Sequence, residues 1–206
     1  RRTEGLALFG ASGLVPLLVN PLYDQLAIAP ADLRWFLPMI GGAIALSLVP
    51  LALLREPERD TSTGFVVRDA LRALIERPLW PVWLATAAFS LMVGVFMTFA
   101  TVAAERRGVA RPATVWLTYA VGALTVRLFG GRLPDRVGTH NLVAPALAAY
   151  IGGCALAATA TDLNEFLVAG LFAGVGHGYC FPVLTAMVVS RTPSAFRGSA
   201  LTSFTA

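Results

Sequence analysis

Residues 166–189, FLVAGLFAGVGHGYCFPVLTAMVV, decide the fold class of this chain. The run contains no Asp, Glu, Arg or Lys, and it exceeds the roughly 20 apolar residues that an α-helix needs to cross a bilayer. Five other stretches are long and mostly apolar, and they are residues 5–26, 33–54, 79–103, 113–129 and 142–160. Another apolar run opens at Gly198. We therefore expect an all-α, polytopic transmembrane bundle with about six full spans and the start of a seventh.

The composition excludes most soluble classes. Hydrophobic residues make up 56% of the 206 residues and charged residues 14%, against roughly 25% charged in soluble domains. The mean hydropathy is +0.69. Barrel strands would be about 10 residues long and alternate in polarity, which these continuous runs do not. The pI of 9.7 does not indicate a nucleic-acid partner, because the basic residues lie between apolar runs and form no patch with aromatics.

All 16 basic residues are arginines, and their distribution predicts an orientation. Basic residues of short loops stay on the cytoplasmic side of a membrane. One end of the spans gathers twelve of them: Arg1, Arg2, Arg55, Arg59, Arg68, Arg72, Arg77, Arg127, Arg132, Arg136, Arg191 and Arg197. The other end holds Arg34, Arg106, Arg107 and Arg111. We expect the first residues and the 130–141 loop to be cytoplasmic; the cluster at 106–111 is the weak point.

The most informative polar string is GGRLPDRVG at residues 130–138, with Arg127 one turn earlier. It resembles the cytoplasmic loop signature of the major facilitator superfamily, in its weaker C-terminal copy, because Thr139 and His140 stand where a basic pair normally follows. The resemblance covers the whole chain and implies helices five to eleven of that fold. It also implies an internal fragment of a multi-pass protein of a bacterial inner (cell) membrane, monomeric when complete.

On that resemblance the chain divides into three parts. Residues 1–54 are the last two helices of the N-terminal six-helix half, and residues 79–206 are helices seven to ten and the start of eleven. Residues 55–78 form a cytoplasmic linker. Within it, residues 65–76 have apolar positions at helical spacing, which predicts either an interfacial helix or a solvated linker helix.

In the family this loop is a conformational latch that holds the outward-facing state, and Asp135 would face the start of the chain around Glu4 and Gly5. The latch residues implied here are Arg127, Gly131, Asp135, Arg136 and Gly138. The alternative is an ordinary polar turn that obeys the positive-inside rule.

The candidate substrate or proton-coupling residues are His177, Tyr119, Asn20, Thr98 and Phe181. An ionisable residue at mid-span normally faces the bundle interior or a wet cavity, and histidine titrates near physiological pH. Each residue has a structural alternative: His177 can bond a helix carbonyl, Tyr119 can simply pack, and Asn20 can bond a neighbouring helix. Thr98 belongs to a small, polar face that suits packing and cavity lining equally.

Gly170, Gly174 and Gly178 recur every four residues in the same segment as His177. Such a stripe permits close approach of another helix backbone, so we expect a packing role. His177 and Cys180 are two metal-ligand types at close spacing, but a metal site needs more than two ligands, so we expect no metal and no other cofactor.

Proton-coupled exporters of the family carry a glycine-rich motif with a Gly-Pro pair in helix five. Residues 10–16 keep its first glycines, but Asn20-Pro21 replaces the pair, which makes the antiporter motif incomplete. The chain has no lysine, hence no P-loop lysine or Schiff base, and we expect no enzyme. The favoured function is a secondary active transporter that exports a small molecule by alternating access with proton coupling. The alternative is a non-transporting receptor, sensor or scaffold of the same fold.

Overall fold

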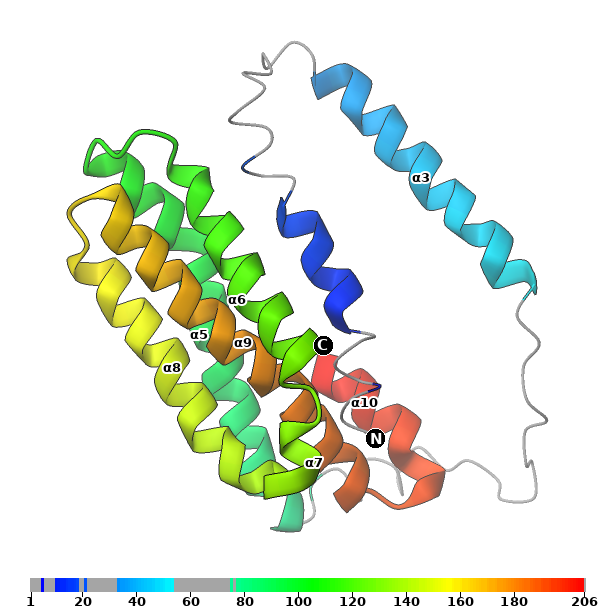
Figure 1. Ribbon diagram of the computed structural model, residues 1–206. Coiled ribbons are helices and arrows are strands. Elements are labelled where there is room, and N and C mark those ends of the chain that lie inside the picture. Colours follow the sequence, from blue (N-terminus) through cyan, green and yellow to red (C-terminus); the bar gives the residue numbers. More distant parts are fainter. Residues whose placement is uncertain are drawn as a thin grey trace.

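A computed structural model of the chain describes residues 5, 10–18, 21, 33–53, 75 and 77–205. Every element in the described part is helical (Figure 1). The α-helices are α3 (Leu33–Leu53), α5 (Trp80–Arg106), α6 (Val115–Phe129), α7 (Leu133–Val137), α8 (Thr139–Thr159), α9 (Leu163–Arg191) and α10 (Arg197–Thr205). Four 3-10 helices accompany them: η1 (Ser12–Leu18), η3 (Arg77–Leu79), η4 (Pro112–Thr114) and η5 (Ser194–Phe196).

The all-α membrane class predicted from the sequence is confirmed. Three described helical stretches are long and apolar enough to cross a membrane, namely Arg77–Arg106, Thr139–Thr159 and Leu163–Arg191. The apolar part of α3, Pro38–Leu53, is shorter. Helix α6 has 15 residues, about 22 Å of helix, which agrees with its being the shortest predicted segment. Of the amphipathic stretch 65–76, Ile75 alone is among the described residues.

Helix α9 is the central element of the bundle. It packs against α6 on one side and α8 on the other, with further contacts to α5 and α10 (Figure 1). Its buried positions cover more than one face and include Phe166, Ala173, Cys180 and Leu184. A helix that is apolar all round in this way is expected where several neighbours surround it.

The α6 side of α9 is built on the glycine stripe predicted from the sequence. A β-carbon at Gly170 would lie 2.6 Å from the Val115 carbonyl oxygen, and one at Gly178 would lie 2.9 Å from the Ala123 carbonyl oxygen. Gly174 lies against the Tyr119 backbone, where a β-carbon would come within 2.8 Å of the carbonyl carbon. These contacts bring the two helix backbones together with no room for a side chain.

A second glycine contact, which sequence reasoning missed, joins α9 to α8. A β-carbon at Gly153 would lie 2.8 Å from the Ala169 carbonyl oxygen, and one at Gly176 would lie 2.8 Å from the Ala146 carbonyl oxygen. Between lipid-exposed helices there is little hydrophobic driving force, so such close van der Waals packing is a main source of stability. Helix α9 is thus held tightly on two sides.

The start of α9 is fixed by a reciprocal cap. The Glu165 backbone N–H donates to Asp162 Oδ1 at 3.0 Å, while Glu165 Oε2 accepts from the Thr161 backbone N–H at 2.5 Å. This pattern satisfies backbone donors that a helix start leaves unpaired. The cap therefore marks the beginning of α9, directly after the short polar link that follows the apolar stretch 142–160.

At the same end of the bundle, Arg107 closes the C-terminus of α8. Its Nη1 donates to the carbonyl oxygens of Ala157 at 2.9 Å and Ala160 at 2.7 Å, and its Nη2 donates to the Ala158 carbonyl oxygen at 2.7 Å. The guanidinium also lies 5.6 Å from the centre of the Phe166 ring. Because carbonyls at a helix C-terminus carry partial negative charge, the arginine here has a structural function.

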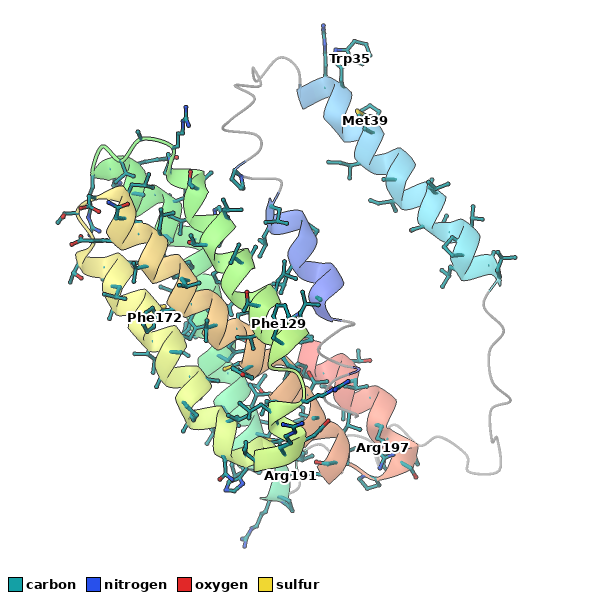
Figure 2. All side chains as sticks on the ribbon, viewed as in Figure 1. Trp35, Met39, Phe129, Phe172, Arg191 and Arg197 are labelled. Atoms are coloured by element: carbon teal, nitrogen blue, oxygen red, sulfur yellow. The ribbon has the colours of Figure 1, made fainter. Side chains whose placement is uncertain are left out.

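Two arginines organise the opposite end of α9. Arg197 Nε donates to the carbonyl oxygens of Val189 at 3.2 Å and Thr192 at 3.3 Å, and so fastens α10 to α9. Arg191 Nη1 lies 3.5 Å from the Pro78 carbonyl oxygen. Both side chains lie at the same end of the bundle (Figure 2).

Helix α3 stands apart from the bundle (Figure 1). Its large apolar side chains are exposed, among them Trp35 and Met39, which project from its surface (Figure 2). An α-helix with this surface fits a lipid environment or other transmembrane helices.

Replacing Gly174 with alanine should destabilise the protein by about 1–3 kcal/mol, because the added methyl group would overlap the Tyr119 backbone. The measurement is a thermal unfolding curve of the complete, detergent-purified protein. The control is Gly94→Ala in α5, where a β-carbon would meet no heavy atom within 4 Å. Equal unfolding temperatures of the two variants would contradict the close α6–α9 contact.

Candidate functional site

Three polar side chains form a hydrogen-bonded chain inside the bundle. Tyr119 of α6 is its middle member, with its hydroxyl 3.1 Å from the Tyr150 hydroxyl of α8 and 2.5 Å from His177 Nδ1 of α9. Both tyrosines are fully buried. His177 is the central residue of α9 (Leu163–Arg191), so these hydrogen bonds lie near the middle of this candidate membrane span.

Aromatic rings enclose this polar chain. Phe89 of α5 meets the His177 ring edge-on at a centroid distance of 5.3 Å, and Phe181 stacks on its other side at 6.5 Å. Phe96 stacks on Tyr119 at 5.6 Å, and Trp116 contacts both at 5.9 and 5.7 Å. Four helices therefore supply one site of polar groups in an apolar wall, which is the usual composition of a small-molecule site.

Only one direction of hydrogen bonding satisfies all three groups. Tyr119 has one proton, so it either donates to His177 Nδ1 and accepts from Tyr150, or accepts from Nδ1–H and donates to Tyr150. The second arrangement needs another acceptor for the Tyr150 proton, and the described residues around this fully buried hydroxyl show only Tyr119 as its partner. The first arrangement requires an unprotonated Nδ1. A proton added to His177 Nδ1 would reverse the direction of donation, so that Nδ1–H donates to Tyr119 and Tyr119 donates to Tyr150.

Arg127 lies next to this cluster and is buried as well. It is 3% exposed, and its guanidinium carbon lies 5.4 Å from the centre of the Phe181 ring. Gly10 packs on the guanidinium from the first apolar segment, where a β-carbon would come within 2.6 Å of Arg127 Nη1. Among the described residues, Arg127 Nε is the one buried side-chain nitrogen or oxygen without a hydrogen-bond partner.

The structure brings together Tyr119, His177 and Phe181, but it places Thr98 elsewhere. Thr98 is exposed and lies about two and a half turns from Phe89 on α5, which puts it on the opposite face of that helix. Thr101 of the same polar face contacts the cluster indirectly, because its hydroxyl accepts from Trp116 Nε1 at 3.0 Å. Asn20 lies outside the described residues.

The loop residues of the expected latch form a compact turn. Asp135 is in the first turn of α7 and Arg136 in its last, and Gly131 is buried. Gly138 has φ +90, which only glycine adopts without strain. Asn141 Nδ2 donates to the Val137 carbonyl oxygen at 2.7 Å and closes the helix. Arg127 packs against Gly10 and the Phe181 ring.

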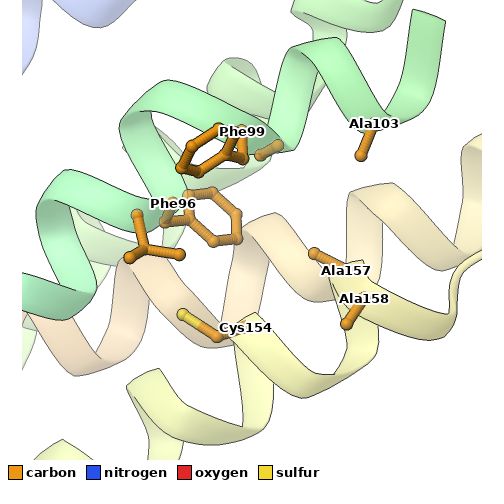
Figure 3. A pocket seen from close by; sticks show the side chains of 8 residues that line it. Phe96, Phe99, Ala103, Cys154, Ala157 and Ala158 are labelled. Carbon is orange, nitrogen blue, oxygen red and sulfur yellow. The ribbon is translucent and has the colours of Figure 1, made fainter. Parts of the chain in front are cut away.

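The described residues also contain an apolar hollow, but it does not form a polar binding site. An apolar hollow of about 120 Å³ between α5 and α8 is lined by side chains that include Phe96, Phe99 and Cys154 (Figure 3). It offers no group that would fix a polar solute. In the described part of the chain, no three His, Cys, Asp or Glu side chains come together as a metal site.

Sequence reasoning missed Tyr150, Phe89 and Phe96. Tyr150 was detectable, because it places a hydroxyl in the middle of the apolar stretch 142–160, and such groups need a partner inside the bundle. The phenylalanines gave no signal, since a lipid-facing and a site-facing phenylalanine look alike in sequence.

Comparison with known proteins identifies the family. The profile of the Major Facilitator Superfamily matches residues 1–206. An uncharacterised MFS-type transporter of Salmonella typhimurium (strain LT2) is 26% identical over 202 residues, which cover 96% of this chain and 48% of that protein. The chain thus spans about half the length of this curated relative, and no solved structure matches it significantly. Family membership agrees with the membrane setting that the long apolar helices indicate. This chain belongs to the major facilitator superfamily.

Proposed function

We propose that the protein is a secondary active transporter that exports a small molecule by alternating access, with His177 as its proton-coupling residue. The observation that carries the proposal is the Tyr150–Tyr119–His177 hydrogen-bonded chain at the middle of the bundle. Polar and ionisable groups are costly at this depth and are retained where they serve a solute or proton pathway. The complete protein would act as a monomer.

Proton coupling needs a group whose protonation changes the hydrogen bonding around it. His177 meets that requirement, because a proton at Nδ1 would turn Tyr119 from donor to acceptor. The rearrangement would reach Tyr150 and thereby connect α6, α8 and α9. Such a change between helices can favour one conformation of the transporter over another.

A counterflow assay on the complete protein in proteoliposomes, with a panel of solutes and ionophores, tests the function as a whole. Movement of a solute against its own gradient supports a transporter. No movement of any solute by well-folded protein would favour the receptor, sensor or scaffold.

We further propose that Asp135, Arg136, Gly131 and Gly138 form a latch that stabilises the outward-facing state. Asp135 lies in the first turn of α7, next to a glycine with positive φ that sets the sharp turn. Arg127 contributes from its buried position beside the first apolar segment. On this proposal, residues 1–54 belong to one half of the transporter and residues 79–206 to the other.

His177→Gln should abolish the pH dependence of transport while substrate still binds, because glutamine keeps a hydrogen bond to Tyr119 but cannot carry a proton. The measurement is the initial rate of transport between pH 5 and pH 8. Tyr119→Phe is the matched variant, since it removes the partner of Nδ1 with little change of volume and should displace the pH profile without abolishing it. If His177 only binds substrate, the apparent affinity falls instead. Unchanged affinity, rate and pH profile would show a structural residue.

Asp135→Asn should cripple transport while insertion and abundance stay near normal. A carboxylate at an exposed turn contributes only about 0–1 kcal/mol to stability as an ion pair, so a large loss of rate would have to come from the conformational cycle. The measurement combines transport rate with membrane abundance by immunoblot. Wild-type rates in the variant would refute the latch.

Single cysteines at Thr139 and Ser62 should be shielded from a membrane-impermeant thiol reagent in intact cells, whereas one at Asp162 should react. The expectation rests on the arginine asymmetry. The arginines at residues 106–111 lie at the end of the spans that we expect to be non-cytoplasmic, which is contrary to the positive-inside rule. Arg107 binds the α8 carbonyls and therefore has a structural function that does not depend on orientation. Cys154 and Cys180 are replaced first in the test protein. The reverse labelling pattern would overturn the orientation.

A further inference from the structure

The side chain of Arg127 carries a buried charge, and the described residues provide no counter-ion for it. Its side chain is 3% exposed and its Nε has no hydrogen-bond partner. Among the described residues, no carboxylate acts on the guanidinium. A buried guanidinium is normally paired, because the loss of its hydration is costly unless an anion replaces the water.

With the centre of α9 taken as the middle of the membrane, the guanidinium falls within the hydrocarbon core. Phe181 follows the central residue of α9 by four positions, about 6 Å along the helix axis, and Arg127 lies over its ring. The core of a bilayer extends about 15 Å to either side of its middle. The guanidinium is therefore too deep for the headgroups to neutralise it.

None of the four carboxylates that the structure describes lies in the middle of a membrane-spanning helix. Of the chain's 12 acidic residues, none falls in the middle of a predicted span. Asp24 comes nearest, two residues before the end of the stretch 5–26. Of the acidic residues that the structure describes, Glu105, Asp162 and Glu165 lie at helix ends and Asp135 lies in α7. The interior of this part of the protein thus holds an arginine and a histidine without an acidic partner.

The position of Arg127 suits a solute as that partner. It belongs to the 79–206 half proposed above and is covered by Gly10 of the other half. Secondary transporters bind substrate near the membrane midplane between their repeats. Movement of one half against the other would uncover the guanidinium. Phe181 and Phe204, whose ring centres are 5.7 Å apart, provide an apolar surface beside it.

We infer that the transported solute is an organic anion with an apolar or aromatic body, and that Arg127 binds its charged group. This inference rests on the proposed transport function. Arginine presents a planar set of donors that matches a carboxylate, phosphate or sulfonate, while the phenylalanines favour an apolar body. The nearby Tyr119 and His177 would contact the remainder of the solute.

The test uses the complete, purified protein and five probes with the same ring: benzoate, phenyl phosphate and benzenesulfonate as anions, benzamide as the neutral control and benzylamine as the cationic control. We expect at least one anion to raise the unfolding temperature of the wild type, whereas benzamide and benzylamine do not. Arg127→Met should abolish that shift. Arg127→Lys, which keeps the charge but not the planar fork, should weaken apparent binding roughly tenfold to hundredfold.

The unfolding temperature without any probe shows whether the partner of Arg127 is a solute or an acidic side chain of the protein itself. If an acidic side chain from outside the described residues pairs with Arg127, Arg127→Met leaves that charge buried alone and lowers the unfolding temperature strongly. That result would overturn the inference. An unchanged or higher unfolding temperature, together with loss of the anion effect, supports it.

Counterflow with the same probes distinguishes failure of this inference from failure of the proposed function. Movement of neutral or cationic solutes that is insensitive to Arg127→Met would overturn the anion site and leave the transporter intact. Absence of any solute movement would overturn the transport function itself. Anion effects of equal size in wild type and Arg127→Met would show that the anion binds elsewhere, which also overturns the inference.

Discussion

The rest of the structure depends on the close contact of α9 with two neighbours at once. Glycines remove the side chains at the contacts, so the backbones of α6 and α8 both approach α9 within van der Waals distance. In a bilayer this contact area has to provide what the hydrophobic effect provides in water. The contacts of α9 with α6 and α8 therefore also fix the position of the residues on its remaining face, which take no part in those contacts.

His177 illustrates the result. It follows Gly176, which contacts α8, and precedes Gly178, which contacts α6. With both flanking positions pressed against helices, the imidazole projects toward α5 and meets Phe89. Tyr119 and Tyr150 lie on those same two neighbouring helices, so one set of glycine contacts aligns all three members of the hydrogen-bonded chain.

The helices could be predicted from the sequence because apolar length alone defines them. The predicted stretches 79–103 and 142–160 correspond closely to α5 (Trp80–Arg106) and α8 (Thr139–Thr159). The glycine stripe was predictable where it recurs every four residues, but Gly153 and Gly176 belong to two different helices and show no common period. The site residues were likewise predictable only where the local sequence marks them. His177 was conspicuous as an ionisable group in an apolar run, whereas its environment required the three-dimensional arrangement.

Two residues show why sequence could not complete the site. Thr98 was assigned to a small, polar face that suits cavity lining, but the buried face of α5 is the one with Phe89 and Phe96. Arg127 stands one turn before the loop in sequence, and in space it is covered by Gly10, more than a hundred residues earlier. Pairings over such separations depend on topology, which local patterns do not contain.

The cap that Arg107 places on α8 also concerns how the protein is made. The carbonyl of Ala157 that it binds is 50 residues further along the chain. The ribosome therefore adds Arg107 to the growing chain well before it adds the residues that Arg107 binds. Until α8 has been synthesised and inserted, the guanidinium must remain hydrated or bound to lipid phosphates. The contact between Arg107 and the end of α8 can therefore form only after two more membrane segments have been synthesised.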